Sequence, residues 1–339
     1  MNIKDLKIIL KESGEPSFRI KQIIGAIYKD GILDFEKINN IPKTLKEKLK
    51  DFPVLSFKVE RINNGIDSKK ALLSLNDERF IESVVIKNVS GYTACVSSQV
   101  GCAMNCAFCA TGQNGFYRNL TSEEITDQIL FWKNYLKDNE NSLITNIVFM
   151  GMGEPFLNYE NLNDSVKDLT DPGMFNIGDR NISVSTSFPS EVNIVKFSKE
   201  FPQINIAISL HFADNKKRSE YMPINKNTDL EDIAKFINKY LQINNRKIFL
   251  EYIMLNDIND NEYDAKKLIE FIKNISKNYL IHVNLIKYNS TFAGFMSSSK
   301  EKILKFEHFL KRGEVSVTIR KSMGEDINGA CGQLAGKKN

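Results

Sequence analysis

The stretch Cys102-Ala103-Met104-Asn105-Cys106-Ala107-Phe108-Cys109 decides the fold expected for this chain. Three thiolates in so short a loop can hold three irons of a four-iron, four-sulfur cluster, which leaves the fourth iron open to an outside ligand. Electron-transfer ferredoxins close every position with four cysteines, and structural zinc sites also take four ligands. The stretch therefore predicts a 4Fe-4S cluster held by Cys102, Cys106 and Cys109. The alternatives are three unrelated loop cysteines or a partial metal clip.

Two further cysteines, Cys95 and Cys331, complete the five in the chain and lie far apart in the sequence. A reducing compartment disfavours a static disulfide between them. Two interpretations stay open at this point. The two thiols are small buried apolar side chains, or they form a transient, catalytic pair.

Length and composition bound the class of protein. The 339 residues suffice for one large α/β core and a small accessory domain, and the 42% hydrophobic fraction is ordinary for a folded soluble protein. No stretch approaches the ~20 apolar residues of a membrane helix, and the first residues lack the pattern of a secretory signal. We therefore expect a cytoplasmic protein with no membrane partner. The net charge of +4 is too mild to prove a nucleic-acid partner. The lysines of residues 43–50 suggest such a partner, or they form a solvated helix face.

The spacing of apolar residues divides the chain into three expected domains. Residues 1–56 are expected to form a helical accessory domain, because apolar side chains recur there at helical intervals. Residues 57–90 are expected to form a β-hairpin and a further strand, with a turn at Asn63-Asn64-Gly65. Residues 91–339 form the expected core, in which strand-like runs alternate with helical segments. Those runs are Thr93–Val96, Ile144–Met150, Ile182–Ser185, Ile204–Leu210, Ile248–Met254 and Ile281–Ile286.

Six strands that alternate with helices predict an α/β fold with a parallel sheet. The count of six suits a partial (βα)6 barrel rather than a closed eightfold barrel, and a doubly wound sheet is the alternative. Capping boxes indicate that helices begin at Thr121, Thr228 and Ser298. Gly313 is the expected C-cap of the last of these helices.

The unusual motifs of the core all follow strands. In such folds the chemistry collects in the loops that leave the C-terminal ends of the strands, so these motifs should share one site. They are the cysteine loop, Gly151-Met152-Gly153-Glu154-Pro155, Ser185-Thr186-Ser187, Ser209-Leu210-His211 and Tyr288-Asn289.

Several residues of these motifs could bind a cofactor. Gly153 exposes backbone where a side chain would block a ligand, and Glu154 could bind a hydroxyl or an ammonium group. Ser185 and Asn289 could hydrogen-bond polar groups, and His211 could contact a cofactor or the substrate. Each has a structural alternative, namely an ordinary glycine turn, a satisfied loop residue or a structural histidine.

Taken together, the motifs resemble a known family. The C-x-x-x-C-x-x-C spacing with an aromatic residue in the last gap resembles the radical S-adenosylmethionine (SAM) enzymes. From the Phe18–Gln22 helix to the C-terminus, the chain resembles the RlmN/Cfr family of radical SAM adenine methyltransferases. The segments that carry this resemblance are Val96–Cys102, Gly115–Thr121, Gly151–Pro155, Ser209–His211, Met222–Asn225 and Ala330–Leu334.

The resemblance implies a role for each candidate residue. The open iron would bind SAM, and two SAM molecules would be used per turnover. Cys331 resembles the cysteine that carries the methyl group, Cys95 resembles the resolving cysteine that forms a transient disulfide bond with it, and Glu82 matches the proton acceptor. The positions that match SAM contacts are Gly153, Glu154, Ser185, Ser209, Leu210, His211 and Asn289.

The implied function is methylation of carbon 2 of an adenosine in 23S ribosomal RNA, with transfer RNA as a possible second substrate. The N-terminal helices would grip folded RNA, a low-potential donor such as flavodoxin or ferredoxin would reduce the cluster, and the enzyme would act as a monomer. Pro155 favours carbon 2, whereas residues 19–22 favour the Cfr-type reaction at carbon 8 of the same adenosine, which confers antibiotic resistance. Two alternatives lie in other classes: a non-catalytic iron–sulfur RNA-binding protein, and a radical SAM enzyme with a small-molecule substrate.

Among the departures from the pattern of the family, two lie next to candidate site residues. Phe188-Pro189 stands after Ser185-Thr186-Ser187, where glycine is usual, and this bears on the expected SAM contact around Ser185. Asn328-Gly329 stands where an acidic residue and alanine are usual, just before Cys331.

Overall fold

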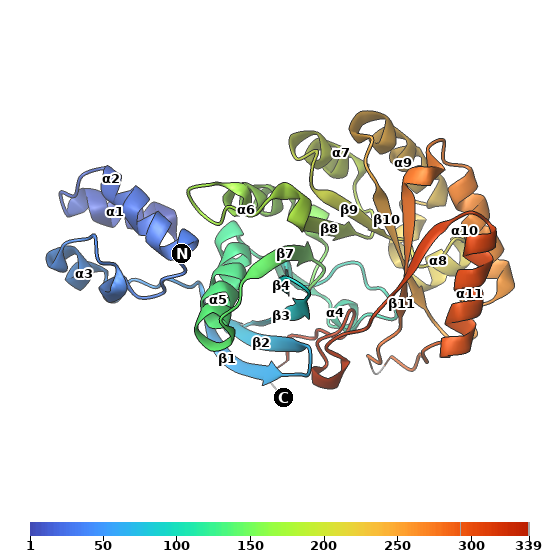
Figure 1. Cartoon of the computed structure of the whole chain (residues 1–339), viewed down its shortest axis with the longest axis horizontal. Helices are drawn as coiled ribbons and strands as arrows, with labels where there is room; N and C mark the ends of the chain where they lie inside the picture. Colours follow the sequence, from blue (N-terminus) through green and yellow to red (C-terminus); the bar gives the residue numbers. More distant parts are fainter. Residues whose placement is uncertain (292, 338–339) are drawn as a thin grey trace.

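The computed structural model describes residues 1–291 and 293–337, and its frame is one ten-stranded sheet. The strands follow one another in the sheet in nearly the order of the sequence (Figure 1). Their bounds, in sheet order, are β1 Phe57–Asn64, β2 Ser68–Leu75, β3 Phe80–Asn88, β4 Gly91–Cys95, β7 Ile144–Phe149, β8 Ile182–Thr186, β9 Asn205–Ser209, β10 Ile248–Met254, β11 Ile281–Lys287 and β12 Ser316–Arg320.

From β4 to β12, each strand is parallel to the next one in the sheet, and helices connect them. Right-handed crossovers in a sheet whose order never reverses place the helices on one face. Figure 1 shows several of these helices along the outer side of the curved sheet. This order excludes the doubly wound alternative, which requires a reversal. The connecting helices are α5 Ser122–Glu140, α6 Tyr159–Thr170, α7 Glu191–Glu200, α9 Leu230–Asn244, α10 Glu262–Lys273 and α11 Lys300–Arg312.

The six expected parallel strands are all present, and the structure adds a seventh parallel strand, β12. Of its five residues only Val317 is buried. Its sequence therefore lacks the apolar character of a central strand, which is why it was missed. A short two-stranded sheet of β5 (Gln99–Gly101) and β6 (Phe116–Asn119) was also missed, and it flanks the cysteine loop. The short helices α4 (Ala110–Gln113) and α8 (Asn215–Tyr221) complete the core.

The strands β1, β2 and β3 form an antiparallel extension that continues into the parallel sheet through β4. The hairpin of β1 and β2 closes where Gly65 N–H donates to the Ser68 carbonyl. The turn therefore begins at Gly65, later than expected, because Asn63 and Asn64 still pair with Lys70 and Lys69 in the strand. Residues 81–85 of β3 are all buried, and Ile81, Val84 and Val85 belong to the same core as the parallel strands.

The N-terminal helices lie beside α5, at one end of the molecule (Figure 1). They are α1 (Ile3–Glu12), α2 (Phe18–Ile24), which continues into a π-helical turn (Gly25–Lys29), and α3 (Lys43–Leu49). Leu6, Ile23 and Ile27 are fully buried among them, as their helical spacing predicts. In the described part of the chain, no helix combines the length and the apolar composition that a membrane crossing requires.

The expected capping boxes locate the helix starts to within one residue. The box at Thr121 is confirmed, with its hydroxyl accepting from Glu124 N–H. The other two are displaced by one position, because Asp229 and Ser299 are the side chains that accept from the first-turn amides. Thr228 instead donates to the Phe188 carbonyl, and Ser298 donates to Asp260. Gly313 ends α11, as expected.

Candidate active site

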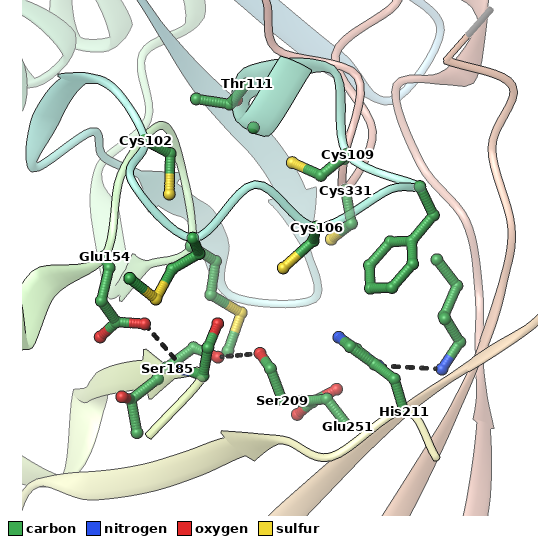
Figure 2. A pocket seen from close by; sticks show the side chains of 18 of the residues that line it. Cys102, Cys106, Cys109, Thr111, Glu154, Ser185, Ser209, His211, Glu251 and Cys331 are labelled. Atoms are coloured by element: carbon green, nitrogen blue, oxygen red, sulfur yellow. Dashed lines mark hydrogen bonds between the residues drawn. The ribbon is translucent and has the colours of Figure 1, made fainter. Parts of the chain in front are cut away.

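A single pocket at the C-terminal ends of the parallel strands collects most of the candidate residues (Figure 2). It opens between the cysteine loop and the ends of β7 to β12, as expected for catalytic groups of a parallel barrel. Its lining includes Cys102, Cys106, Cys109, Gly153, Glu154, Ser185, Ser209, His211 and Cys331. Leu210, Asn289, Cys95 and Glu82 do not line it.

The cysteine loop is held in place by backbone hydrogen bonds. Cys102 N–H donates to the Gly115 carbonyl over 2.8 Å, and Ala107 N–H donates to the Tyr221 carbonyl over 2.9 Å. Gly101, with φ of +75°, lies so close to Gly115 that a Cβ at Gly101 would be 1.9 Å from the Gly115 oxygen. The loop can therefore follow this path only because residue 101 is glycine.

The three loop sulfurs fit a cluster better than a single ion. Figure 2 shows all three side chains at the same pocket. Within residues 1–291 and 293–337, no three His, Cys, Asp or Glu side chains form a group that could hold one metal ion. A four-iron cluster receives each thiolate at a different iron, so its ligands need not converge on one point. Burial raises the pKa of the Cys102 thiol to about 12. Bound iron would supply the positive charge that deprotonates such a thiol.

Glu154 follows β7 and is buried at the edge of the pocket. One carboxylate oxygen accepts from Ser187 N–H over 2.7 Å and the other from Phe156 N–H over 3.2 Å. Burial raises the pKa of Glu154 to about 7, against the effect of these hydrogen bonds. The neighbouring Gly153 has φ of +103°, and a Cβ there would lie 2.5 Å from the side chain of Gln99. Close packing on Gln99, as well as ligand access, therefore requires glycine at 153.

Phe188 stands where the family usually has glycine, and the hydrogen bond from Ser187 N–H to Glu154 is still present. Phe188 adopts φ of +73°, a conformation that normally favours glycine. Its ring is fully buried and packs on Phe236, with 5.0 Å between the ring centroids. This turn leaves Ser187 N–H directed at Glu154. Burial of the ring compensates for the unfavourable φ, so the local path around Ser185 survives without glycine.

The strands β8, β9 and β10 contribute polar groups to the pocket floor. The hydroxyls of Ser185 and Ser209 are 3.2 Å apart. His211 accepts a hydrogen bond at Nδ1 from Ile253 N–H, and burial lowers its pKa to about 3. A neutral ring that accepts at Nδ1 carries its proton on Nε2, so His211 is a fixed hydrogen-bond donor at neutral pH. Leu210 packs into the core beneath them.

Cys331 contributes to the electrostatic environment of Cys95. Cys331 is accessible from the pocket, while Cys95 is buried at the end of β4. Burial raises the pKa of Cys95 to about 12, and the neighbouring Cys331 adds to this effect. Asn289, buried behind the pocket, donates to the Cys331 carbonyl over 3.4 Å. Both cysteines are free thiols, so the structure does not contain the disulfide bond suggested by the resemblance. A transient disulfide stays a prediction.

Sequence reasoning missed two charged residues of the pocket, Glu251 and Arg320. Glu251 is buried on β10, where it accepts from Asn284 over 2.8 Å and pairs with Arg320 over 3.4 Å. Arg320 ends β12 and lowers the pKa values of both Cys95 and Cys331. The sequence did offer a signal for Glu251, because it is the one carboxylate within the apolar run Ile248–Met254. It offered none for Arg320, which belongs to the unpredicted strand β12.

Glu82 lies outside the cysteine pocket and lines a separate polar cavity with Lys70, Arg61 and Lys337. One of its carboxylate oxygens is 2.7 Å from the Lys70 ammonium. The other accepts from the backbone N–H groups of Ala335 and Gly336. The structure therefore connects Glu82 to the C-terminal segment that carries Cys331.

Comparison with known proteins agrees with this arrangement. The family model described as the radical SAM superfamily matches residues 96–269, and that of the ribosomal RNA large subunit methyltransferase N-terminal domain matches residues 1–54. The chain is 39% identical to the "Probable dual-specificity RNA methyltransferase RlmN" of Carboxydothermus hydrogenoformans, over 99% of this chain and 97% of the relative. It is 40% identical to the "Dual-specificity RNA methyltransferase RlmN" of Vesicomyosocius okutanii, over 96% of this chain and 90% of the relative.

The crystal structure of a radical SAM methyltransferase from Sphaerobacter thermophilus superposes with a TM-score of 0.92 at 34% identity, covering 99% of this chain and 98% of that one. The match extends over the N-terminal helices, the sheet and the segment that carries Cys331. The chain therefore belongs to the radical SAM superfamily and, within it, to the RlmN-type RNA methyltransferases.

Proposed function

We propose that this enzyme methylates carbon 2 of an adenosine in 23S ribosomal RNA, with transfer RNA as a second substrate, through a methyl group carried on Cys331. The observation that carries the proposal is the position of Cys331. It lies in the same pocket as the three loop cysteines and within electrostatic reach of Cys95. A cysteine that carries a methyl group must reach both the methyl donor and the thiol that later resolves the intermediate. From its position Cys331 would reach SAM in the pocket and the thiol of Cys95.

The residues around the pocket would hold SAM. Cys102, Cys106 and Cys109 would hold the 4Fe-4S cluster, and Glu154, Ser185, Ser209 and the Nε2–H of His211 offer partners for its polar groups. Gly153 would complete the lining. Asn289 would act through the Cys331 carbonyl, and Leu210 would support the site from the core beneath it. When bound, SAM and the cluster supply a methyl group and, from a second SAM molecule, the radical that removes a hydrogen atom from that methyl group.

The chain's own residues then divide the remaining work. Carbon 2 of adenine is a poor nucleophile, so a direct polar transfer of methyl would fail, and Cys331 carries the carbon to the ring instead. Glu82 takes the ring proton, and the thiolate of Cys95 attacks the sulfur of Cys331. A disulfide forms as the carbon–sulfur bond breaks, and the released carbon takes up a proton to complete the methyl group of the product. The unpaired electron left by the radical addition would return to the cluster. Arg320 favours the thiolate form that both cysteines need.

The proposal also includes the partners. A low-potential donor such as flavodoxin or ferredoxin would reduce the cluster, and the enzyme would act as a monomer in the cytoplasm. The target adenine must leave its stack to reach the pocket. The N-terminal helices, which expose Lys43, Lys48 and Lys50, would hold the folded RNA by its phosphates.

Mass spectrometry of nucleosides tests the proposal. We expect 2-methyladenosine in 23S RNA after incubation with anaerobically reconstituted enzyme, SAM and reductant. The Cys331→Ala variant should give no product, while its iron content and RNA affinity stay at the wild-type level. Recovery of 8-methyladenosine would contradict the assigned position on the ring. Binding of RNA without SAM cleavage by the wild type would contradict catalysis.

A further inference from the structure

Lys70 lies on β2 and is only 8% exposed. Lysine is rarely buried to this extent unless it is paired. Its ammonium is 2.7 Å from a carboxylate oxygen of Glu82 and donates to the Asn328 carbonyl over 3.0 Å. These two contacts connect β2 both to β3 and to the C-terminal segment.

Lys70 contacts the chain before Cys331, and the second carboxylate oxygen of Glu82 contacts the chain after it. It accepts from Ala335 N–H over 2.6 Å and from Gly336 N–H over 3.0 Å. Asn328 precedes Cys331, and Ala335 follows it. A single Lys70–Glu82 ion pair therefore holds the chain on both sides of the methyl-carrying cysteine.

The C-terminal segment is positioned by contacts from other elements, which include the backbone hydrogen bond from Ala110 N–H to the Gly332 carbonyl over 2.8 Å as well as side-chain contacts. After β12, its described residues contain one short 3-10 helix, Glu325–Ile327, and no strand or α-helix. Without a ladder of backbone hydrogen bonds, contacts from other elements determine where Cys331 lies. Thr111 also contributes, because its hydroxyl donates to the Leu334 carbonyl over 2.6 Å.

We propose that Lys70 is a positioning residue for methyl transfer, which sets Cys331 and the Glu82 carboxylate relative to each other. The inference rests on the proposed function, in which both groups act on the same ring carbon. The carbon held by Cys331, after it has lost one hydrogen atom, bonds to that ring carbon as a radical, and the unpaired electron would pass to the cluster. The ring C–H bond then breaks, its electron pair stays in the ring, and the proton forms an O–H bond on Glu82. Neither Lys70 nor Glu82 lines the cysteine pocket, so SAM binding should not depend on their pairing.

Lys70→Met tests this role, with Lys69→Met as the matched control. Lys69 is the next residue on the same strand, and alternation along the strand places it on the opposite face, where it pairs with Glu140 over 2.8 Å. Both variants lose one positive charge, so general attraction of RNA falls equally. We expect Lys70→Met to lower kcat for RNA methylation at least tenfold, with iron content and KM for SAM unchanged. Lys69→Met should stay within twofold of the wild type, and Lys70→Arg should recover most of the lost rate.

Amide hydrogen exchange over residues 329–337 provides a second readout that needs no chemistry. We expect faster exchange in Lys70→Met than in Lys69→Met. If the wild type methylates no RNA, the proposed function fails, and the exchange difference still decides whether Lys70 positions the segment. Equal exchange in the two variants, or an undiminished kcat in Lys70→Met, would overturn the inference. Parallel loss of iron, SAM binding and thermal stability would also overturn it, because Lys70 would then be merely structural.

Discussion

The pKa values of the Cys95 and Cys331 thiols are shifted in opposite directions by their surroundings and by the guanidinium of Arg320. Desolvation raises the pKa values of both the buried Cys95 and the Cys331 that opens to the pocket, and Arg320 lowers both. The thiolate is the reactive form of cysteine. Arg320 is partly exposed to solvent, but its ion pair with the buried Glu251 keeps the guanidinium at the pocket. We therefore expect Arg320 to control how easily Cys331 accepts a methyl group.

The first prediction concerns the pH dependence of Cys331 alkylation in Arg320→Gln. Removing the guanidinium takes away the interaction that lowers the Cys331 pKa, so the thiolate should form only at higher pH. The midpoint of the alkylation rate against pH should rise by roughly one unit, as expected for loss of a nearby opposite charge. Peptide mass spectrometry at residue 331 measures this rate. Lys321→Gln is the control, because Lys321 is exposed and pairs with Asp67 instead. An unchanged or lower midpoint in Arg320→Gln would refute the assignment.

The second prediction concerns Cys95→Ala. If Cys95 resolves the covalent intermediate, its loss should leave Cys331 joined to RNA through the transferred carbon. A stable protein–RNA species should accumulate and be visible as a slow band on a denaturing gel, with turnover reduced by a factor of at least ~10². The Cys95→Ala/Cys331→Ala double variant should form no such species. Free methylated RNA at the wild-type rate from Cys95→Ala would exclude a resolving role.

At the scale of elements, the β5–β6 hairpin fixes the path of the cysteine loop. Phe116–Asn119 forms a strand that pairs with Gln99–Gly101 on the other side of the cysteine loop. The critical position is Gly101, whose positive φ and close approach to Gly115 leave no room for a side chain. Proper placement of Cys102 therefore depends on an element too short to be recognised from its composition.

The third prediction compares Gly101→Ala with Gly115→Ala. Both glycines have positive φ, so each substitution should cost about 1 kcal/mol in backbone strain. A Cβ at Gly101 would also collide with the Gly115 carbonyl, whereas nothing lies within 4 Å of a Cβ at Gly115. We expect Gly101→Ala to lose more than half of its bound iron after reconstitution and Gly115→Ala to retain it. Iron and sulfide analysis measures this, and equal iron content in the two variants would count against the argument.

The sequence predicted the regular elements well because their physical signals are local. Alternation in β1 to β3, apolar runs in the parallel strands and the capping box at Thr121 all depend on neighbouring residues. The pocket was predictable because C-terminal strand ends of a parallel sheet share one edge. The contacts of Lys70 and Arg320 were not predictable, since each joins residues far apart in the chain. Strand β12, with Val317 as its one buried residue, gave no local signal either.

At the scale of the whole molecule, α5 connects the N-terminal helices to the core. The Lys133 ammonium donates to the carbonyls of Tyr28 and Lys29, and Asn134 donates to the Gly31 carbonyl. Other residues of α5, such as Ile125 and Ile129, are buried in the core of the sheet. The N-terminal helices therefore have a defined position relative to the pocket, although Figure 1 shows them at a different end of the molecule from β11 and β12.

The last prediction follows from this separation. Replacing Lys43, Lys48 and Lys50 with alanine should weaken RNA binding, because exposed lysines contact phosphates and release counterions. The slope of log affinity against log salt should fall by roughly 0.9 for each phosphate that the variant no longer neutralises. Methylation of Cys331 by SAM in the absence of RNA should not change, since these lysines do not line the pocket. Filter binding at several salt concentrations and mass spectrometry of the protein measure the two effects. Alanine at Lys196, Lys199 and Lys239, which are exposed on α7 and α9, is the matched control for charge. An equal loss of affinity in both triple variants would mean that net charge, and not the N-terminal surface, attracts the RNA.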